Sequence, residues 1–147
     1  MNIRFATDRY SVRRLAKALD ADKIVANDFG HAQLFTLPDN TKRSRVIEAA
    51  LLGCPLPRIF CLRLNDGTLD IKRNAGIVDA LKMFLYGAFR LEGLQVLHEY
   101  EGMYFKSLPP LQQGLIEDYT LDIAWTNEGI PDDALFVLCK YTVGNFA

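Results

Sequence analysis

The feature that most constrains the fold of this sequence is a turn signal between two short apolar segments. Residues 58–64 are mostly apolar and rich in β-branched or aromatic side chains, and residues 69–72 form a shorter segment that returns. Between them stands Asn-Asp-Gly-Thr at residues 65–68. Asp-Gly tolerates the positive φ angles of a tight turn, so the pattern predicts an antiparallel β-hairpin.

Two helical patterns precede the hairpin. Ser11 is expected to cap a first helix, because its hydroxyl can accept a hydrogen bond from the unpaired N–H groups of the first turn. Thr41 is expected to cap a second helix, which Gly53 and Pro55 end. Spacings of three and four residues predict the inward faces of the two helices: Val12, Leu15, Ala18 and Leu19 in the first, and Val46, Ile47, Ala50 and Leu51 in the second.

After the hairpin, residues 75–86 carry the apolar stripe of a third helix, which Gly87 stops. Residues 88–104 are expected to form short strands and loops. The remaining expected elements are a fourth helix opened by Ser107, Pro109 and Pro110, a strand over residues 120–125 and a last helix over residues 131–141. This order predicts an α+β fold, a small mixed sheet with a β-hairpin flanked by about five helices.

Length and composition favour one globular domain over residues 1–147. Half of the residues are apolar and 24% are charged, and no apolar run approaches the ~20 residues of a membrane span. The first ten residues carry charges where a signal peptide needs an apolar core, so we expect a cytoplasmic protein without membrane contact. The net charge of −1 gives no general attraction for polyanions.

Few residues suggest metal or cofactor chemistry. Cys54, Cys61 and Cys139 each lie in an apolar run without a Cys-x-x-Cys, which predicts buried, reduced thiols. His31 and His98 have no neighbour at a metal-binding spacing. No phosphate-binding glycine loop or dinucleotide fingerprint occurs. We therefore expect no metal and no cofactor.

Several blocks in a fixed order give the chain a family likeness. It resembles the ParB/sulfiredoxin-like domain at the N-terminus of GmrSD-type (type IV) restriction enzymes, over about residues 10–144. The blocks that carry the likeness are YSVRRL at 10–15, IVANDF at 24–29, RVIE at 45–48, GCPLP at 53–57, FLYGAFRLEG at 84–93 and GMYFKSL at 102–108. The resemblance implies a ParB/sulfiredoxin-like fold.

The polar motifs that the resemblance calls for are replaced. The family's Phe-Gln-Arg reads Phe-Gly-His at residues 29–31, and its Asp-Gly-x-Gln-Arg reads Arg-Asn-Ala-Gly-Ile at 73–77. Its Phe-x-Arg-Leu-Asn reads Phe-Val-Leu-Cys-Lys at 136–140. In the family these groups serve nucleotide binding and hydrolysis, in which an arginine clamps phosphate and an acid positions a metal or water. Among the motif positions only Glu48 keeps its family-type side chain, and no nuclease domain of the HNH type is expected.

The leading hypothesis is a non-catalytic structural or protein-interaction module, a pseudoenzyme with no catalytic residues. By analogy with the family, it would be a phage virion component or a modulator of restriction, with a protein partner or a second copy as ligand. An exposed apolar patch or a self-association surface should accompany this function.

Two alternatives stay open. The first is binding of nucleotide or nucleic acid without turnover, through a basic patch at the old pocket. The candidate residues for nucleotide or phosphate are Lys42, Arg43, Arg45, Lys72, Arg73, His31 and Glu48. The second is an enzyme with a rebuilt site around Glu48, Asp70 or Asp79.

Overall fold

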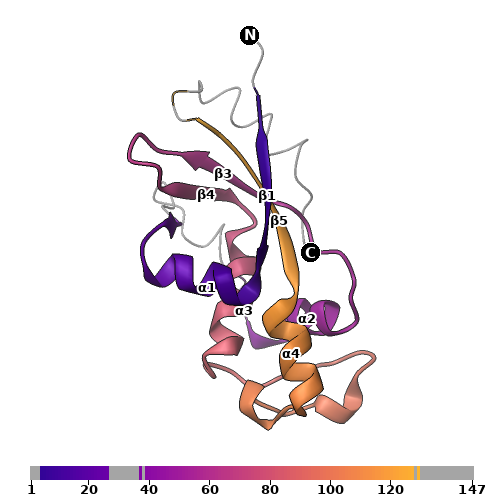
Figure 1. Cartoon of the computed structure of the whole chain (residues 1–147). Coiled ribbons are helices and arrows are strands. Elements are labelled where there is room, and N and C mark those ends of the chain that lie inside the picture. Colours follow the sequence, from indigo (N-terminus) through magenta and orange to yellow (C-terminus); the bar gives the residue numbers. More distant parts are fainter. Residues whose placement is uncertain (1–3, 27–36, 38, 128, 130–147) are drawn as a thin grey trace.

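The computed structural model describes residues 4–26, 37, 39–127 and 129 of the chain. These residues form a five-stranded mixed sheet, in the order β1-β5-β3-β4-β2, and four α-helices, so the fold is α+β as predicted (Figure 1). The strands are β1 (Ala6–Ser11), β2 (Ile24–Val25), β3 (Ile59–Arg63), β4 (Leu69–Arg73) and β5 (Thr120–Asn127). The helices are α1 (Val12–Asp20), α2 (Asn40–Leu51), α3 (Ala75–Leu85) and α4 (Pro110–Asp118).

The predicted hairpin is confirmed. β3 and β4 pair antiparallel, with Leu62 opposite Asp70, and the Asp66 carboxylate accepts a hydrogen bond from the backbone N–H of Thr68 across the turn. Gly67 has a φ of 89°, the positive angle that the Asp-Gly signal anticipates. The third helix, the fourth helix and the strand that begins at Thr120 are also confirmed.

The strand β1 was not predicted. Its sequence ATDRYS has no apolar alternation that would identify a strand, and the structure shows it only through its antiparallel pairing with β5. β5 runs antiparallel to β1 and parallel to β3, so it lies between them. β1 passes directly into α1 at Ser11, whose hydroxyl accepts a hydrogen bond from the N–H of Arg14 as expected of a cap.

The predicted cap of the second helix was wrong. Asp39, and not Thr41, precedes the first turn of α2 and accepts a hydrogen bond from the N–H of Lys42. Thr41 instead lies inside the helix against Gly93, where a Cβ would come within 2.8 Å of the Thr41 methyl carbon. Gly93 has a φ of 72°, so this loop needs glycine both for its conformation and for its close approach to α2.

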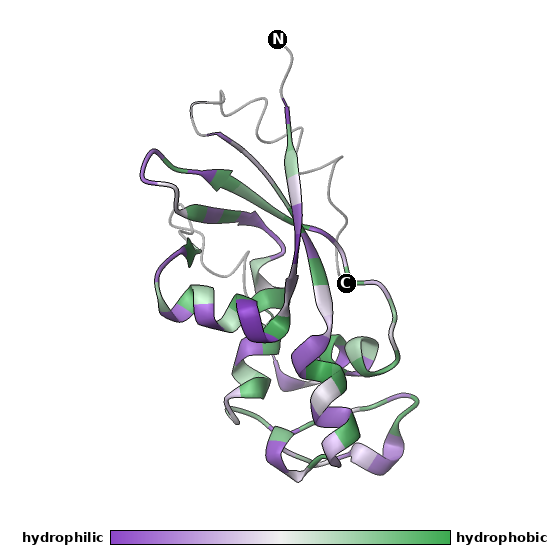
Figure 2. Cartoon of the chain, in the orientation of Figure 1, coloured by the Kyte–Doolittle hydropathy of each residue, from purple (hydrophilic) through white to green (hydrophobic). Residues whose placement is uncertain are grey.

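The main core lies between the sheet and the helices. In Figure 1 the helices gather in the lower half of the molecule, below the β3–β4 hairpin. α3 is buried along most of its length, whereas α1 alternates between hydrophilic and hydrophobic residues (Figure 2). The largest fully buried side chains are Phe60, Phe84, Leu15, Ile24, Ile47, Ile59, Ile71, Ile77, Leu81, Leu91, Ile116 and Leu121. Phe60, Leu62 and Ala124 form a separate small cluster with Phe5.

The predictions for residues 88–104 and for the cysteines agree with the structure only in part. Within the described residues, the segment 88–104 contains no strand; it forms loops and the 3₁₀ turn His98–Tyr100. Cys61 is buried, but Cys54 is exposed because it follows the end of α2, so its predicted burial was wrong. The predicted helix at residues 131–141, Cys139 and His31 lie outside the described residues.

Candidate functional site

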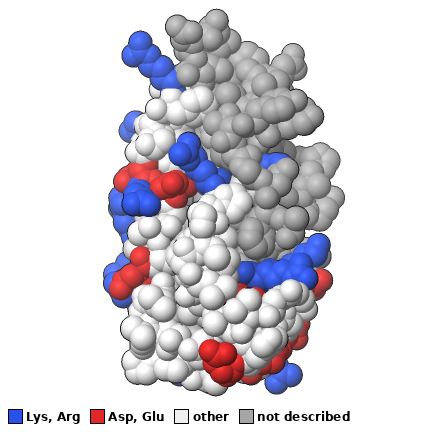
Figure 3. Space-filling model, turned by 90° about the vertical axis from the view of Figure 1, so that its right-hand side faces the viewer, with Lys and Arg blue, Asp and Glu red and all other residues white. Residues whose placement is uncertain are grey.

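A groove of about 860 Å³ opens between the C-terminal end of α2, the loop that follows it and α4. We call it the leucine groove, since Leu52, Leu111 and Leu115 line it together with Cys54, Pro55 and neighbouring residues. Figure 3 shows the side of the molecule on which the loop after α2 lies. A broad area of this face carries neither basic nor acidic side chains, and charged groups lie at its edges.

The local sequence builds both walls of the groove. α2 ends where Gly53 adopts a φ of 73° and the N–H of Cys54 bonds back to the carbonyl of Ala49, a common way to close a helix. Pro55 then prevents the helix from continuing. On the opposite wall Pro109 and Pro110 start α4, where a missing backbone N–H costs nothing.

The three leucines are unusually exposed. The exposed fractions are 70% for Leu111 and 44% for both Leu52 and Leu115. Among the described residues, only three other large apolar side chains are exposed. Leu111 and Leu115 are four residues apart, so they lie on the same face of α4. Burying a leucine stabilises by about 1.5–3 kcal/mol, so this cluster offers substantial binding free energy to an apolar partner surface.

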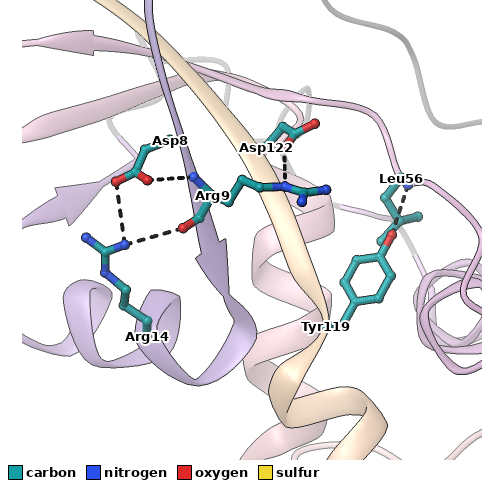
Figure 4. Close-up of polar contacts among 6 residues, drawn as sticks. All are labelled: Asp8, Arg9, Arg14, Leu56, Tyr119 and Asp122. Carbon is teal, nitrogen blue, oxygen red and sulfur yellow. Dashed lines mark hydrogen bonds and ion pairs between the residues drawn. The ribbon is translucent and has the colours of Figure 1, made fainter.

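Tyr119 fixes the position of the loop wall. Its hydroxyl donates to the carbonyl of Cys54 at 2.7 Å. It also accepts from the N–H of Leu56 at 3.0 Å, and Figure 4 shows this second bond. Burial raises the pKa of Tyr119 above its ordinary value, so the phenol stays protonated and keeps donating at neutral pH. One side chain thus satisfies two backbone groups of an otherwise irregular segment.

The charges at the edge of the groove are already paired within the chain. Arg9 contacts Asp122 at 3.1 Å (Figure 4), and Arg13 contacts both Glu117 and Asp118 at 3.2 Å. These pairs are exposed, so each adds little to stability. Their consequence is electrostatic: both arginines have carboxylate partners, and three carboxylates against two arginines leave this edge with one excess negative charge.

Glu48 does not line the leucine groove. Its two carboxylate oxygens accept hydrogen bonds of 2.9–3.1 Å from the backbone N–H groups of Gln95, Val96 and Leu97. Burial opposes ionisation, but these N–H groups and nearby His98 outweigh it and lower the pKa of Glu48. The one motif acid that the sequence retains therefore anchors the loop before the 3₁₀ turn.

The predicted basic residues do not form one exposed patch. Lys72 is only 7% exposed and its ammonium lies 2.5 Å from the carboxylate of Asp70, which is also buried. Lys42 and Arg45 are exposed on α2, whereas Arg43 is half-buried and donates to the side chain of Asn40. Within the part of the chain that the structure describes, the buried Nε atoms of Arg43 and Arg73 have no hydrogen-bond partner.

The described residues do not bring together the three acids of the alternative in which the chain is an enzyme with a rebuilt site. Asp70 is paired with Lys72, Glu48 is engaged by backbone, and Asp79 lies within α3. In the described part of the chain, no group of three or more His, Cys, Asp or Glu side chains could hold a metal ion. None of the helices described is long and apolar enough to cross a membrane.

Sequence reasoning missed the leucine groove. The signal that the sequence offered was the pair Leu111 and Leu115 in a short helix. Ile116 is the residue of α4 that is buried in the core, so the two leucines are not needed there. Both leucines are instead exposed on the surface of α4. Comparisons with protein-family models, with curated proteins and with solved structures found no match for this chain. The resemblance to the ParB/sulfiredoxin-like domain therefore stays a prediction.

Proposed function

We propose that this protein is a non-catalytic protein-interaction module, and that its leucine groove docks a second copy of the chain. The observation that carries the proposal is the exposure of Leu52, Leu111 and Leu115 around one hollow. Monomers rarely leave several large apolar side chains exposed together without a partner for them. The proposal retains a ParB/sulfiredoxin-like origin, in which Glu48 and Lys72 now make structural contacts instead of catalytic ones.

A second copy fits this surface better than an unrelated charged partner. A two-fold dimer needs one patch that is complementary to itself. Here the same face offers a ridge, made by Leu111 and Leu115 on α4, and a hollow beside it that a ridge can enter. Both arginines of the rim have carboxylate partners, as Arg9–Asp122 and Arg13–Asp118, so neither copy brings an unpaired arginine to the contact. Such a self-associating module suits the virion or restriction-modulating setting that the family analogy suggests.

Sedimentation equilibrium over a range of protein concentrations tests the proposal. The wild type should form dimers, and Leu111→Arg should be monomeric because it places a charge in the centre of the interface. Val96→Arg is the matched control, since Val96 is 60% exposed in a different loop and should leave the dimer intact. A wild type that stays monomeric at hundreds of micromolar would overturn the proposal, as would equal weakening by the two variants.

Exposed Cys54 provides a second, geometric measurement. Cys54 lines the groove, so the proposed dimer should shield its thiol from alkylation by a maleimide, and dilution to monomers should restore the reactivity. Cys54→Ser identifies the part of the labelling that belongs to this thiol. A Cys54 reactivity that does not change with protein concentration would place the dimer contact elsewhere.

A further inference from the structure

A second cavity, of about 690 Å³, lies where α1 faces the tip of the β3–β4 hairpin. We call it the basic pocket, because Arg14, Lys17, Lys23 and Arg63 line it. Asp22 and Asp66 are the acidic residues of the lining, and Asp8 pairs with Arg14 from outside it, so four cations face three carboxylates and the pocket keeps one excess positive charge in a chain whose net charge is −1. Positive charge is thus concentrated here against the general balance of the molecule.

The positive charge of the pocket is available to a ligand. Among the described residues, no carboxylate lies within ion-pair distance of Lys17, Lys23 or Arg63. Arg14 is held in place, with its guanidinium 3.9 Å above the ring of Tyr10 and 3.5 Å from the carboxylate of Asp8. The other three cations are exposed, so an anion can reach them.

Aromatic rings accompany the cations. Tyr10 and Trp125 both line the pocket, and each packs partly against the core, so the rings are fixed in position while remaining partly accessible. The register places Trp125 of β5 beside Cys61 of β3, two residues before Arg63 on the same face of the sheet. A flat ring and a cation are therefore offered side by side, the pairing that an unstacked base and its phosphate require.

The walls of the pocket are small and rigid. Ala18 lies on the same face of α1 as Arg14, by its spacing, and Ala21 follows the end of the helix; the short side chains of both alanines line the pocket. The segment after α1 is tied to the hairpin by a hydrogen bond from the N–H of Leu69 to the carbonyl of Lys23, and β2 pairs with β4. A preformed site of this kind loses little entropy on binding.

We infer that the basic pocket binds single-stranded nucleic acid, with phosphates at Lys17, Lys23 and Arg63 and a base stacked on Trp125. A duplex keeps its bases stacked inside and cannot offer one to a ring recessed beside α1, so a single strand fits better than double-stranded DNA. This site is separate from the leucine groove and from the basic residues of α2, and it does not depend on the proposed dimer.

The intrinsic fluorescence of Trp125, the only tryptophan of the chain, reports directly on the pocket. Titration with an oligonucleotide of about 12 nucleotides should quench this fluorescence as a base stacks on the indole. Lys17→Glu with Arg63→Glu should weaken the binding, followed by fluorescence anisotropy of a labelled strand, by at least about tenfold. Lys42→Glu is the matched control, because it reverses an exposed charge outside the pocket and should change the affinity little.

Further ligands separate the strand from other anions. A duplex of the same length, a single mononucleotide, poly-glutamate and an abasic strand should each bind more weakly than the intact strand. Equal affinity for any of these, binding without quenching, or no binding at low salt would overturn the inference. Equal weakening by Lys42→Glu would do the same, since it would show general charge attraction. Circular dichroism confirms that the double variant is folded, and Lys23→Glu replaces it if it is not.

Discussion

The leucine groove and the basic pocket are of similar size but handle charge in opposite ways. At the groove, Arg9 and Arg13 are each matched by carboxylates of α4 or β5, and the centre is apolar. At the pocket, Lys17, Lys23 and Arg63 keep their charge available around two aromatic rings. Among the described residues, both arginines at the groove have ion-pair partners, whereas three cations of the pocket have none, so a near-neutral protein has two chemically distinct surfaces. Overall net charge therefore says little about what either surface binds.

The largest effect is expected from the framework that supports the groove. Glu48 lies one turn before Leu52, and Glu48→Gln replaces a carboxylate that accepts from three backbone N–H groups by an amide. We expect a loss of about 2–3 kcal/mol in the free energy of unfolding, measured with urea. Glu99→Gln, an exposed change in the same region, should cost almost nothing. Equal stabilities of the two variants would contradict the anchoring role of Glu48.

The same carboxylate gives a pH dependence whose sign is fixed. Because its pKa is lowered on folding, its stabilising contribution is complete above the ordinary value of 4.5 and is lost as the pH falls through the lower folded value. The difference in stability between wild type and Glu48→Gln should therefore shrink in acid below pH 4.5. A difference that stays constant down to the acid transition would mean that the charge of Glu48 is irrelevant.

Salt should separate the two surfaces most clearly. Strand binding through about three phosphate contacts should weaken on the order of 20-fold between about 50 and about 200 mM salt. Dimerisation through the leucines should change little, or strengthen slightly, because apolar burial is not screened. Parallel anisotropy and sedimentation measurements on one protein sample check both. A shared salt dependence would remove the contrast between the surfaces.

Tyr119→Phe should weaken dimerisation through the leucine groove without changing strand binding at the basic pocket. It leaves the N–H of Leu56 and the carbonyl of Cys54 without their partner, at a cost of about 1 kcal/mol in unfolding free energy. The dimer should weaken with the loosened wall while strand binding is unchanged. Tyr104→Phe, at an exposed tyrosine, is the control. Loss of strand binding in Tyr119→Phe would show that the two surfaces are coupled.

The smallest effect is expected at the hairpin tip. Asp66→Asn removes one of two opposing carboxylates from the basic pocket but keeps an oxygen that can accept from Thr68, so the turn survives. Strand affinity should rise by about two- to threefold at low salt, as expected for one exposed charge. An unchanged affinity would mean that the strand does not pass the tip.

The elements that the sequence predicted are those specified locally. Three signals act through their own backbone angles: the Asp-Gly turn, the glycine after α3 and the prolines before α4. Such signals can be recognised in the sequence without knowledge of the fold. β1 escaped prediction because its partner in the Arg9–Asp122 pair lies 113 residues away. Thr41 is not the cap of α2; it lies inside the helix close to Gly93, a residue distant in sequence, while Asp39 caps the helix.

The candidate sites were harder to predict than the fold, for a related reason. Lys72 and Glu48 have the residue types of a phosphate site, but their roles depend on Asp70 and on the N–H groups of residues 95–97. Conversely, the residues that line the basic pocket come from α1, the hairpin and β5, which are far apart in the sequence. No single stretch of sequence therefore predicts the pocket. Local patterns identify charged residues, whereas the fold decides which of those charges are already satisfied.

The position of β5 between β1 and β3 has a consequence for how the chain is made. β5 is the last of the described strands to leave the ribosome, yet it joins β1 to the rest of the sheet. Until it arrives, one side of β3 and all of β1 lack their hydrogen-bonding partners, and exposed strand edges invite association with other chains. Nascent chains that stop before residue 120 should therefore need chaperone protection, and release of β5 should end that need in a single cooperative step.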